Sequence, residues 1–268
     1  RGMAAMSRIE EVLAEPEEEE TLRPVEGSPW KRPGFWAQGI EIRGLTWGYP
    51  AAGNLSGRPE TATALHEVCM RIPGGTFTAL VGPTGCGKTT LTRLLTRLYN
   101  PPAGTVTVGG TDLTAIPLEE LRRHLAVATQ ESFLFSRTLA ENIGFGRPEA
   151  GRQEIEQAAE TAELLRDLGE LPSGFETRVG ERGITLSGGQ RQRAAIARLI
   201  VYGAPVVLFD DSFSSVDLKT EGRILAGLRE RLRGRTVLLI THRIGMPVAG
   251  ALMGRGDQPF WDRVGGRP

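Results

Sequence analysis

The chain has 268 residues, the length of one large domain or of two unequal ones. Its 32 basic and 32 acidic side chains cancel, so overall charge gives no reason to expect a nucleic-acid partner. The content of 40% hydrophobic and 24% charged residues is typical of a folded globular domain, and no apolar run approaches the roughly 20 residues of a membrane-spanning helix. Two cysteines are too few for a disulfide framework.

Residues 1–39 differ in composition from the rest of the chain. Acidic residues are concentrated after Pro16, and prolines recur through the remainder of the segment. These features predict a solvated linker. Its three bulky aromatic residues, Trp30, Phe35 and Trp36, are candidate anchors that dock the linker on the folded body.

Regular secondary-structure signals begin at residue 40. Strands are predicted at residues 40–49, 64–72, 76–81 and 105–108, a hairpin loop at 50–63, and a helix at 89–99. Residues 118–203 have a mostly helical pattern, whereas 206–209 and 236–241 are apolar runs typical of strands buried on both faces. Strands alternating with helices indicate a three-layer α/β core, and the long helical insertion is expected to be a subdomain.

A glycine-rich loop follows the strand predicted at 76–81. It reads Gly82-Pro83-Thr84-Gly85-Cys86-Gly87-Lys88-Thr89 and leads, through Thr90, into a helix. This is the P-loop pattern with both flanks that its mechanism requires, because glycines let backbone N–H groups surround phosphate oxygens at a helix N-terminus. Lys88 can reach the β- and γ-phosphates, and the Thr89 hydroxyl can ligate Mg²⁺. Cys86 is interpreted as a small residue that the loop tolerates.

The apolar strand at 206–209 ends in Asp210, a carboxylate that would hold Mg²⁺ through water. A strand ending in aspartate is a weak signal alone but a strong one beside a P-loop. The Asn-Lys-x-Asp motif that reads guanine in GTPases is absent from the sequence, which disfavours a GTPase.

A second candidate anion site lies in the sequence Leu186-Ser187-Gly188-Gly189-Gln190. Its Gly-Gly turn stands directly before a predicted helix, and a helix N-terminus favours negative charge. The P-loop already surrounds the phosphates of one nucleotide. The second turn is therefore expected to close on ATP bound by another subunit.

With these five residues the chain resembles the nucleotide-binding domain of ABC transporters, over roughly residues 40–243. The resemblance implies an α/β fold, a P-loop NTPase core with an antiparallel β subdomain and a helical, signature-bearing subdomain at about 118–203. It implies ATP and Mg²⁺ as ligands. Ser187, Gly188, Gly189 and Gln190 would contact ATP held by the partner domain.

The resemblance also assigns roles to residues outside these two motifs. Tyr49 looks like the aromatic residue that stacks on adenine, and Gln130 like the Q-loop glutamine near Mg²⁺ and the membrane-domain contact. Residues 215–217 resemble the D-loop at the dimer interface, and His242 the switch histidine at the γ-phosphate.

The exporter branch of the family is the one that the sequence resembles. Residues 179–183 are similar to the exporter X-loop, and residues 133–136 and 138–143 to exporter sequence after the Q-loop. The start of the chain is similar to the end of an exporter's last transmembrane helix. This implies a transmembrane domain N-terminal to the chain, a second nucleotide-binding domain as partner, and a location at the cytoplasmic face of the cell membrane.

Two alternatives belong to other functional classes. A soluble ABC-type ATPase of DNA repair or translation would have long coiled-coil insertions or tandem cassettes, and the sequence has neither. An ATP-binding regulatory subunit with little hydrolysis is the second alternative.

That second alternative arises from Asp211, which stands where active family members have the glutamate that orients the attacking water. Aspartate is one methylene shorter, and general-base geometry tolerates little misplacement. We therefore expect impaired hydrolysis, as in the degenerate half of a heterodimeric exporter. The retained His242 weakens this hypothesis slightly, and a homodimer with two slow sites also fits.

Residues 244–268 are a second departure from the family pattern. The family continues with a helix, a strand pair and a further helix, whereas these residues are rich in glycine and show little periodicity. We expect an atypical C-terminal tail, of the kind that a truncated or altered reading frame would produce.

Overall fold

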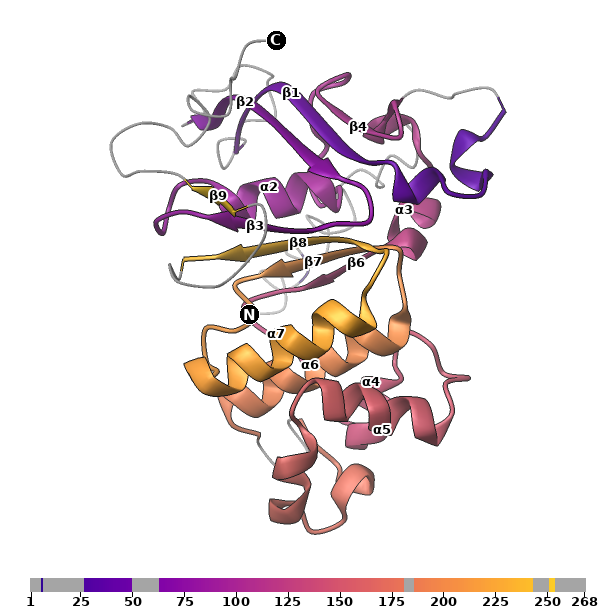
Figure 1. Cartoon of the computed structure of the whole chain (residues 1–268), viewed down its shortest axis with the longest axis vertical. Coiled ribbons are helices and arrows are strands. Elements are labelled where there is room, and N and C mark those ends of the chain that lie inside the picture. The colour runs from indigo at the N-terminus through magenta and orange to yellow at the C-terminus, as the bar shows by residue number, and fades with distance from the viewer. Residues whose placement is uncertain (1–5, 7–26, 50–62, 181–185, 243–250, 254–268) are drawn as a thin grey trace.

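The computed structural model describes residue 6 and residues 27–49, 63–180, 186–242 and 251–253. The elements form successive layers, which Figure 1 shows from top to bottom: an antiparallel sheet, helix α2, a parallel sheet, helices α6 and α7, and a group of short helices. Among the described residues, none of the helices combines the length and apolar character needed to cross a membrane.

The parallel sheet is the centre of the fold, and all its strand pairs are parallel. Its strand order is β6 (Leu125–Ala128), β7 (Val206–Asp210), β8 (Thr236–Thr241), β3 (Phe77–Val81) and β9 (Ala251–Met253). Alternate side chains of the central strands enter different cores: Leu208 packs on one face and Phe209 on the other. This explains why β7 and β8 are apolar at nearly every position.

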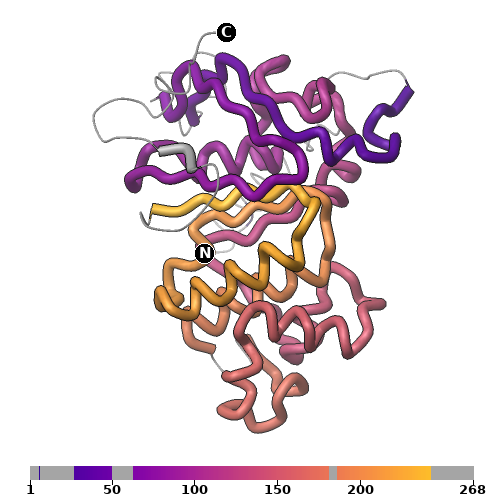
Figure 2. The backbone as a smooth tube through the Cα atoms, in the orientation of Figure 1, coloured from indigo at the N-terminus to yellow at the C-terminus, as the bar shows by residue number. Residues whose placement is uncertain are grey.

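Helices cover both faces of this sheet. On one face α2 (Lys88–Leu95) contributes buried Leu91 and Leu94 to the same cluster as Leu208. On the other face α6 (Gly188–Tyr202) and α7 (Leu218–Arg231) contribute Ile196 and Leu228 to the cluster that contains Phe209. The backbone trace in Figure 2 shows the same separation of α2 from α6 and α7 by the sheet. The predicted three-layer α/β core is therefore confirmed.

An antiparallel sheet packs over α2. It has the order β2 (Thr63–Pro73), β1 (Gly39–Gly48), β4 (Val106–Val108) and β5 (Thr111–Asp112). Inward-facing residues of β1 and β2, such as Ile42 and Val68, join the leucines of α2 in one cluster. The antiparallel sheet thus covers α2 on the side opposite the parallel sheet.

The helical subdomain follows β6 and contains α4 (Leu139–Ile143), α5 (Arg152–Thr161) and the 3-10 helices Leu165–Glu170 and Gly174–Glu176. The helical pattern expected from residue 118 was wrong in one respect, because α3 (Leu118–His124) leads into strand β6 of the parallel sheet. A run of four apolar residues cannot be distinguished from part of a helix by periodicity.

The segment before β1 packs on the body through its aromatic residues. Two 3-10 turns, Pro29–Lys31 and Phe35–Ala37, bury Trp30, Phe35 and Trp36. The Trp36 ring stacks on His124 of α3 with 4.7 Å between ring centroids and 4° between planes. The three expected anchors therefore do lie in the core, whereas residues 1–5 and 7–26 of the predicted linker lie outside the described residues.

Three of the described C-terminal residues form β9, which pairs with β3 at the edge of the parallel sheet. The sequence of the tail showed little periodicity and no strand was predicted there, so β9 is an addition to the expected elements. Residues 243–250 and 254–268 lie outside the described residues, as do the hairpin loop at 50–62 and the X-loop residues 181–185.

Candidate nucleotide-binding site

The P-loop connects β3 to α2, so its glycines lie at the carboxyl end of a central parallel strand. Gly87 is the N-cap of α2 and has a φ of 90°, a left-handed conformation that favours glycine. A Cβ there would also lie 2.6 Å from Leu65 Cδ2 and 2.9 Å from the Ala64 carbonyl oxygen. Backbone geometry and close packing against β2 therefore both require glycine at this position.

The Lys88 side chain bends back over the loop. Its Nζ donates hydrogen bonds to the carbonyl oxygens of Gly82, at 2.8 Å, and Pro83, at 2.7 Å, and lies 3.5 Å from Cys86 Sγ. The ammonium group is thus held at the centre of the predicted phosphate loop. Phosphate oxygens can replace these carbonyl acceptors, because both are strong acceptors for a charged donor.

Thr89 and Asp210 meet across the ends of α2 and β7. The Thr89 hydroxyl donates to Asp210 Oδ1 at 3.3 Å, although the two residues are 121 positions apart. Burial raises the pKa of the Asp210 carboxyl above its ordinary value, and the hydrogen bond from Thr89 opposes that effect. A buried carboxylate is stabilised by a nearby cation, so this pair is suited to a metal ion.

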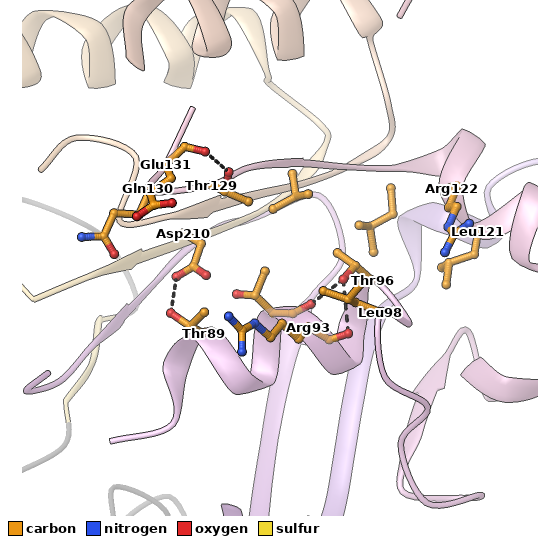
Figure 3. A pocket seen from close by; sticks show the side chains of 13 residues that line it. Thr89, Arg93, Thr96, Leu98, Leu121, Arg122, Thr129, Gln130, Glu131 and Asp210 are labelled. Carbon is orange, nitrogen blue, oxygen red and sulfur yellow. Dashed lines mark hydrogen bonds between the residues drawn. The ribbon is translucent and has the colours of Figure 1, made fainter. Parts of the chain in front are cut away.

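Gln130 follows β6 and lines the same cavity of about 620 Å³ as Thr89 and Asp210 (Figure 3). Hydroxyl, carboxylate and amide oxygens are the donors that Mg²⁺ prefers in proteins, so the three residues fit this ion. The cavity extends along α2 past Thr96 to Arg122.

Asp211 and His242 form a second polar pair beside Asp210. His242 Nδ1 lies 2.8 Å from Asp211 Oδ1. Asp211 has a φ of 50°, which is uncommon for a residue other than glycine, and its N–H donates to the Ile240 carbonyl of β8. The turn after β7 therefore aims the Asp211 side chain toward the end of β8, where His242 stands.

Tyr49 comes directly after β1 and reaches the first turns of α2. Its hydroxyl lies 3.1 Å from Thr90 Oγ1 and accepts a hydrogen bond from Arg93 Nη1 at 2.8 Å. The rings of Trp47 and Tyr99 contact Tyr49 edge to face, at centroid distances of 4.7 and 5.4 Å. The predicted adenine-binding residue is thus held next to the P-loop helix.

The signature turn lies on the other side of the parallel sheet from α2. The Ser187 hydroxyl accepts from the Gln190 N–H at 3.2 Å, and Gln190 Oε1 accepts from the Ser187 N–H at 2.9 Å. This reciprocal capping box fixes the start of α6. None of the signature residues lines the cavity that contains Thr89 and Asp210. Residues 82–88 of the P-loop do not line it either, so the two candidate phosphate-binding turns are separated by their positions on opposite sides of the parallel sheet.

A group of aromatic side chains lies beyond Gln130, where the sequence suggested a membrane-domain contact. Phe135 stacks on Phe145 with centroids 4.1 Å apart, and Phe133, 64% exposed, meets Phe135 edge to face. These rings line a groove of about 350 Å³ together with Arg198 and Tyr202. We call this feature the aromatic groove.

Sequence reasoning missed two polar residues of α6. Arg198 supports the aromatic groove by donating to the backbone oxygens of Phe133 and Asn142. Gln192, 3% exposed, makes hydrogen bonds to Gln130, which follows β6, and to Ser215, which lies between β7 and α7. A signal for Gln192 was present, because it lies four and eight residues before Ile196 and Ile200, on the apolar face of the helix.

Comparison with known proteins agrees with the resemblance that the sequence motifs show. The sequence model of the ABC transporter family matches residues 65–214. The chain is 37% identical, over 91% of its length, to the probable multidrug resistance ABC transporter ATP-binding/permease protein YheI of Bacillus subtilis, of which it covers 39%. It is 43% identical, over 69% of its length, to the ATP-dependent lipid A-core flippase of Legionella pneumophila, of which it covers 32%.

A solved structure is similar over nearly the whole chain. It is a bacterial Atm1-family ABC exporter with ATP bound, with a TM-score of 0.78 and 32% identity over 94% of this chain and 42% of that one. The chain therefore spans about a third to two fifths of the length of these relatives.

Proposed function

This chain belongs to the ABC transporter family, and we propose that it is the ATP-hydrolysing motor domain of an exporter, which closes with a second such domain around ATP. The observation that carries the proposal is the convergence of Lys88, Thr89 and Asp210 at one edge of the parallel sheet, with the signature turn on the other side of that sheet from α2. A domain with this arrangement needs a partner to complete each nucleotide site.

In the proposed site Tyr49 stacks on adenine, and residues 82–90 hold the phosphates. Lys88 exchanges the carbonyl oxygens of Gly82 and Pro83 for β- and γ-phosphate oxygens. Thr89, Asp210 and Gln130 would hold Mg²⁺, which neutralises phosphate charge when bound. Catalysis then consists of positioning and charge stabilisation by groups already arranged around the phosphates.

Ser187 and the two glycines after it are proposed to contact the γ-phosphate of ATP held by the partner domain. The capping box leaves the first N–H groups of α6 directed out of the helix end, where an anion is favoured. ATP then contacts both domains in the closed dimer and only one in the open dimer. Its differential affinity for the closed state drives the conformational cycle.

We further propose that hydrolysis is slow at this chain's own P-loop, and that the partner is a different subunit. Asp211 is one methylene shorter than glutamate, and its Oδ1 is already engaged by His242 at 2.8 Å. Reach and orientation therefore both limit its action on a water molecule at the γ-phosphate.

The aromatic groove supports a membrane-domain partner. Phe133 and Phe145 are 64% and 42% exposed, although large apolar side chains at a surface are favourable only when something covers them. The groove follows Gln130 in the chain, so an element docked in it lies near the nucleotide cavity. We propose that a short helix of a transmembrane domain occupies it, which places this domain at the cytoplasmic face of the membrane.

The decisive test is ATP binding by the chain and by Lys88→Ala, measured by titration with a fluorescent ATP analogue. The parent is expected to bind with Mg²⁺, and the variant to bind at least about 30-fold more weakly, because several charge-assisted hydrogen bonds to phosphate are lost. Lys219→Ala, on the exposed face of α7, serves as the matched control. Equal affinity of Lys88→Ala and the control would overturn the site.

A further inference from the structure

Gln192 joins two loops that precede and follow it by many residues in the chain. Its Nε2 donates to the Gln130 carbonyl at 3.2 Å and to Ser214 Oγ at 2.8 Å, and its Oε1 accepts from the Ser215 N–H at 2.9 Å. The side chain is 3% exposed, so water cannot replace these bonds without a rearrangement of the loops. One buried amide thus bridges the predicted Q-loop and D-loop.

The partners of this amide allow only one kind of side chain. The Gln130 carbonyl can only accept and the Ser215 N–H can only donate, so the bridging group must carry a donor and an acceptor. Glutamate has nearly the same shape, but its carboxylate would bring an oxygen against the Gln130 carbonyl oxygen. Methionine would leave both backbone groups without the amide. Glutamine therefore matches both partners, whereas glutamate and methionine do not.

Ser215 in turn packs against the signature turn. A Cβ on Gly189 would lie 2.9 Å from the Ser215 carbonyl oxygen, and one on Gly188 would lie 3.2 Å from Ser215 Oγ. The D-loop and the signature turn of one chain are consequently in direct contact. A shift of Ser215 would therefore displace Gly188 and Gly189, the glycines that are proposed to contact the partner's ATP.

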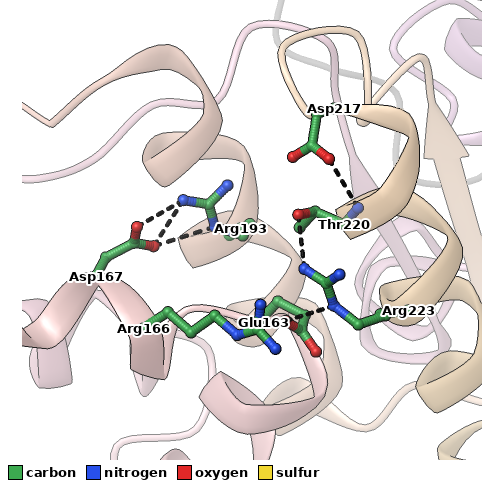
Figure 4. Close-up of polar contacts among 7 residues, drawn as sticks. All are labelled: Glu163, Arg166, Asp167, Arg193, Asp217, Thr220 and Arg223. Carbon is green, nitrogen blue, oxygen red and sulfur yellow. Dashed lines mark hydrogen bonds and ion pairs between the residues drawn. The ribbon is translucent and has the colours of Figure 1, made fainter.

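Ion pairs hold the rest of this region together (Figure 4). Arg193 binds Asp167 of the helical subdomain through two nitrogens, with a shortest distance of 2.6 Å. Arg223 of α7 binds Glu163 at 2.9 Å and also donates to the Thr220 hydroxyl. The signature helix, the D-loop helix and the helical subdomain therefore form one connected unit.

We propose that Gln192 is a positioning residue that transmits the state of this chain's own nucleotide cavity to the signature turn and D-loop facing the partner's ATP. The inference rests on the proposed function. Gln130 lines the cavity with Thr89 and Asp210, and its carbonyl is held by the same amide that holds Ser215. Movement of the Q-loop when ATP binds is thereby passed to the surface that completes the second site.

The test uses the full-length transporter with Gln192→Glu and Asp211 unchanged, because this chain's signature turn completes the partner's site, where hydrolysis is then measured. We expect kcat to fall about tenfold, the effect of a small misplacement of a catalytic surface, while the Kd for fluorescent ATP and the melting temperature stay near the parent's. Gln153→Glu on the exposed side of α5 adds the same charge outside these contacts and should leave kcat unchanged. Gln192→Met is the second variant if the carboxylate prevents folding.

A double-mutant cycle with Ser187→Ala separates positioning from general damage. If Gln192 acts through the signature turn, the double variant should be within about twofold of the slower single variant. Multiplied losses, an unchanged kcat, or a parallel fall in kcat, ATP affinity and melting temperature would each overturn the inference. A parent that does not bind ATP would instead overturn the proposed function, independently of Gln192.

Discussion

His242 at the end of β8 contacts Asp211 after β7, with 2.8 Å between Nδ1 and Oδ1. The two strands are neighbours in the parallel sheet, so their carboxyl ends bring together residues that are 31 positions apart. Asp211 adopts a left-handed φ of 50° at this point, a conformation that aspartate tolerates better than most residues other than glycine. This turn directs the Asp211 carboxylate toward His242 at the edge of the sheet that also carries the P-loop.

Asp211→Glu is expected to raise the steady-state ATPase rate about 10- to 100-fold, because a carboxylate misplaced by about one bond length loses that much as a base. Phosphate release by this chain, assayed without a different partner subunit so that only its own P-loop hydrolyses ATP, measures the rate, and fluorescent-ATP binding is measured in parallel. The Kd should change little, since the role proposed for Asp211 is to orient water and not to hold ATP.

His242→Ala provides the control for this prediction. It should lower the rate in both the parent and the Asp211→Glu background, because the expected contact of His242 with the γ-phosphate is lost in each. A parent already as fast as Asp211→Glu would contradict the degenerate-site hypothesis and make a homodimer the simpler assembly.

The sequence predicted the parts of the site that are local patterns with flanking elements. The P-loop was recognisable because a strand precedes Gly82 and a helix begins at Lys88, and Asp210 because it ends an apolar strand. The structure adds the contact between Thr89 and Asp210, which joins the two motifs at 3.3 Å. This contact depends on the order of the strands in the sheet, and hydrophobic periodicity alone does not predict that order.

Features that depend on long-range contacts were not predictable in the same way. Strand β6 has only four residues, and its pairing with β7 decides its conformation. The role of Gln192 depends on loops 62 and 23 positions away. The short strand β9 likewise owes its conformation to the exposed edge of β3, to which it adds.

Trp36→Ala is expected to destabilise the chain by roughly 3 to 5 kcal/mol, the usual loss for a buried tryptophan. The ring is 6% exposed, stacks on His124, and donates from Nε1 to the Trp30 carbonyl at 3.2 Å. Denaturant unfolding followed by circular dichroism measures the change.

Two further variants serve as comparisons for Trp36→Ala. His124→Ala removes the stacking partner, together with the 2.8 Å contact of His124 Nδ1 with the Glu120 carbonyl, and should lose about 1 to 2 kcal/mol, while exposed Lys31→Ala should change stability by less than about 0.5 kcal/mol. Equal stability of Trp36→Ala and Lys31→Ala would show that the segment before β1 is not docked in solution.

Phe133→Ser tests the aromatic groove. Because the ring is 64% exposed, the unfolding free energy of the isolated domain should change by less than about 0.5 kcal/mol, and its ATP affinity should remain that of the parent. In the full-length protein, we expect loss of substrate stimulation of the ATPase, because the proposed docking of the membrane domain in the aromatic groove would be lost.

Leu165→Ser is the matched control for the groove, since it removes an apolar side chain that is 38% exposed in the helical subdomain and does not line the groove. Retained substrate stimulation in Phe133→Ser would exclude this side chain from the membrane-domain contact. Equal losses of substrate stimulation in both variants would indicate that any polar residue introduced on the surface has this effect.

Asp210→Asn should raise the melting temperature of the ATP-free chain at neutral pH while abolishing stabilisation by Mg²⁺ and ATP. Burial raises the pKa of Asp210 above its ordinary value of 3.8, so the folded state binds its proton more tightly than the unfolded state does. Ionisation therefore destabilises the folded parent. The stability advantage of Asp210→Asn should be absent below pH 3.8, grow as the pH rises toward the raised pKa, and then stay constant.

Thermal unfolding of the two proteins across this pH range, with and without Mg²⁺ and ATP, measures both effects. Ligand binding to the folded state alone should raise the parent's melting temperature and leave that of Asp210→Asn nearly unchanged. Glu160→Gln, on the exposed side of α5, controls for the loss of one negative charge. If the stability advantage of Asp210→Asn shrank as the pH rose, the inference that burial raises the pKa of Asp210 would be wrong. If Mg²⁺ and ATP stabilised the variant as much as the parent, Asp210 would not belong to the metal site.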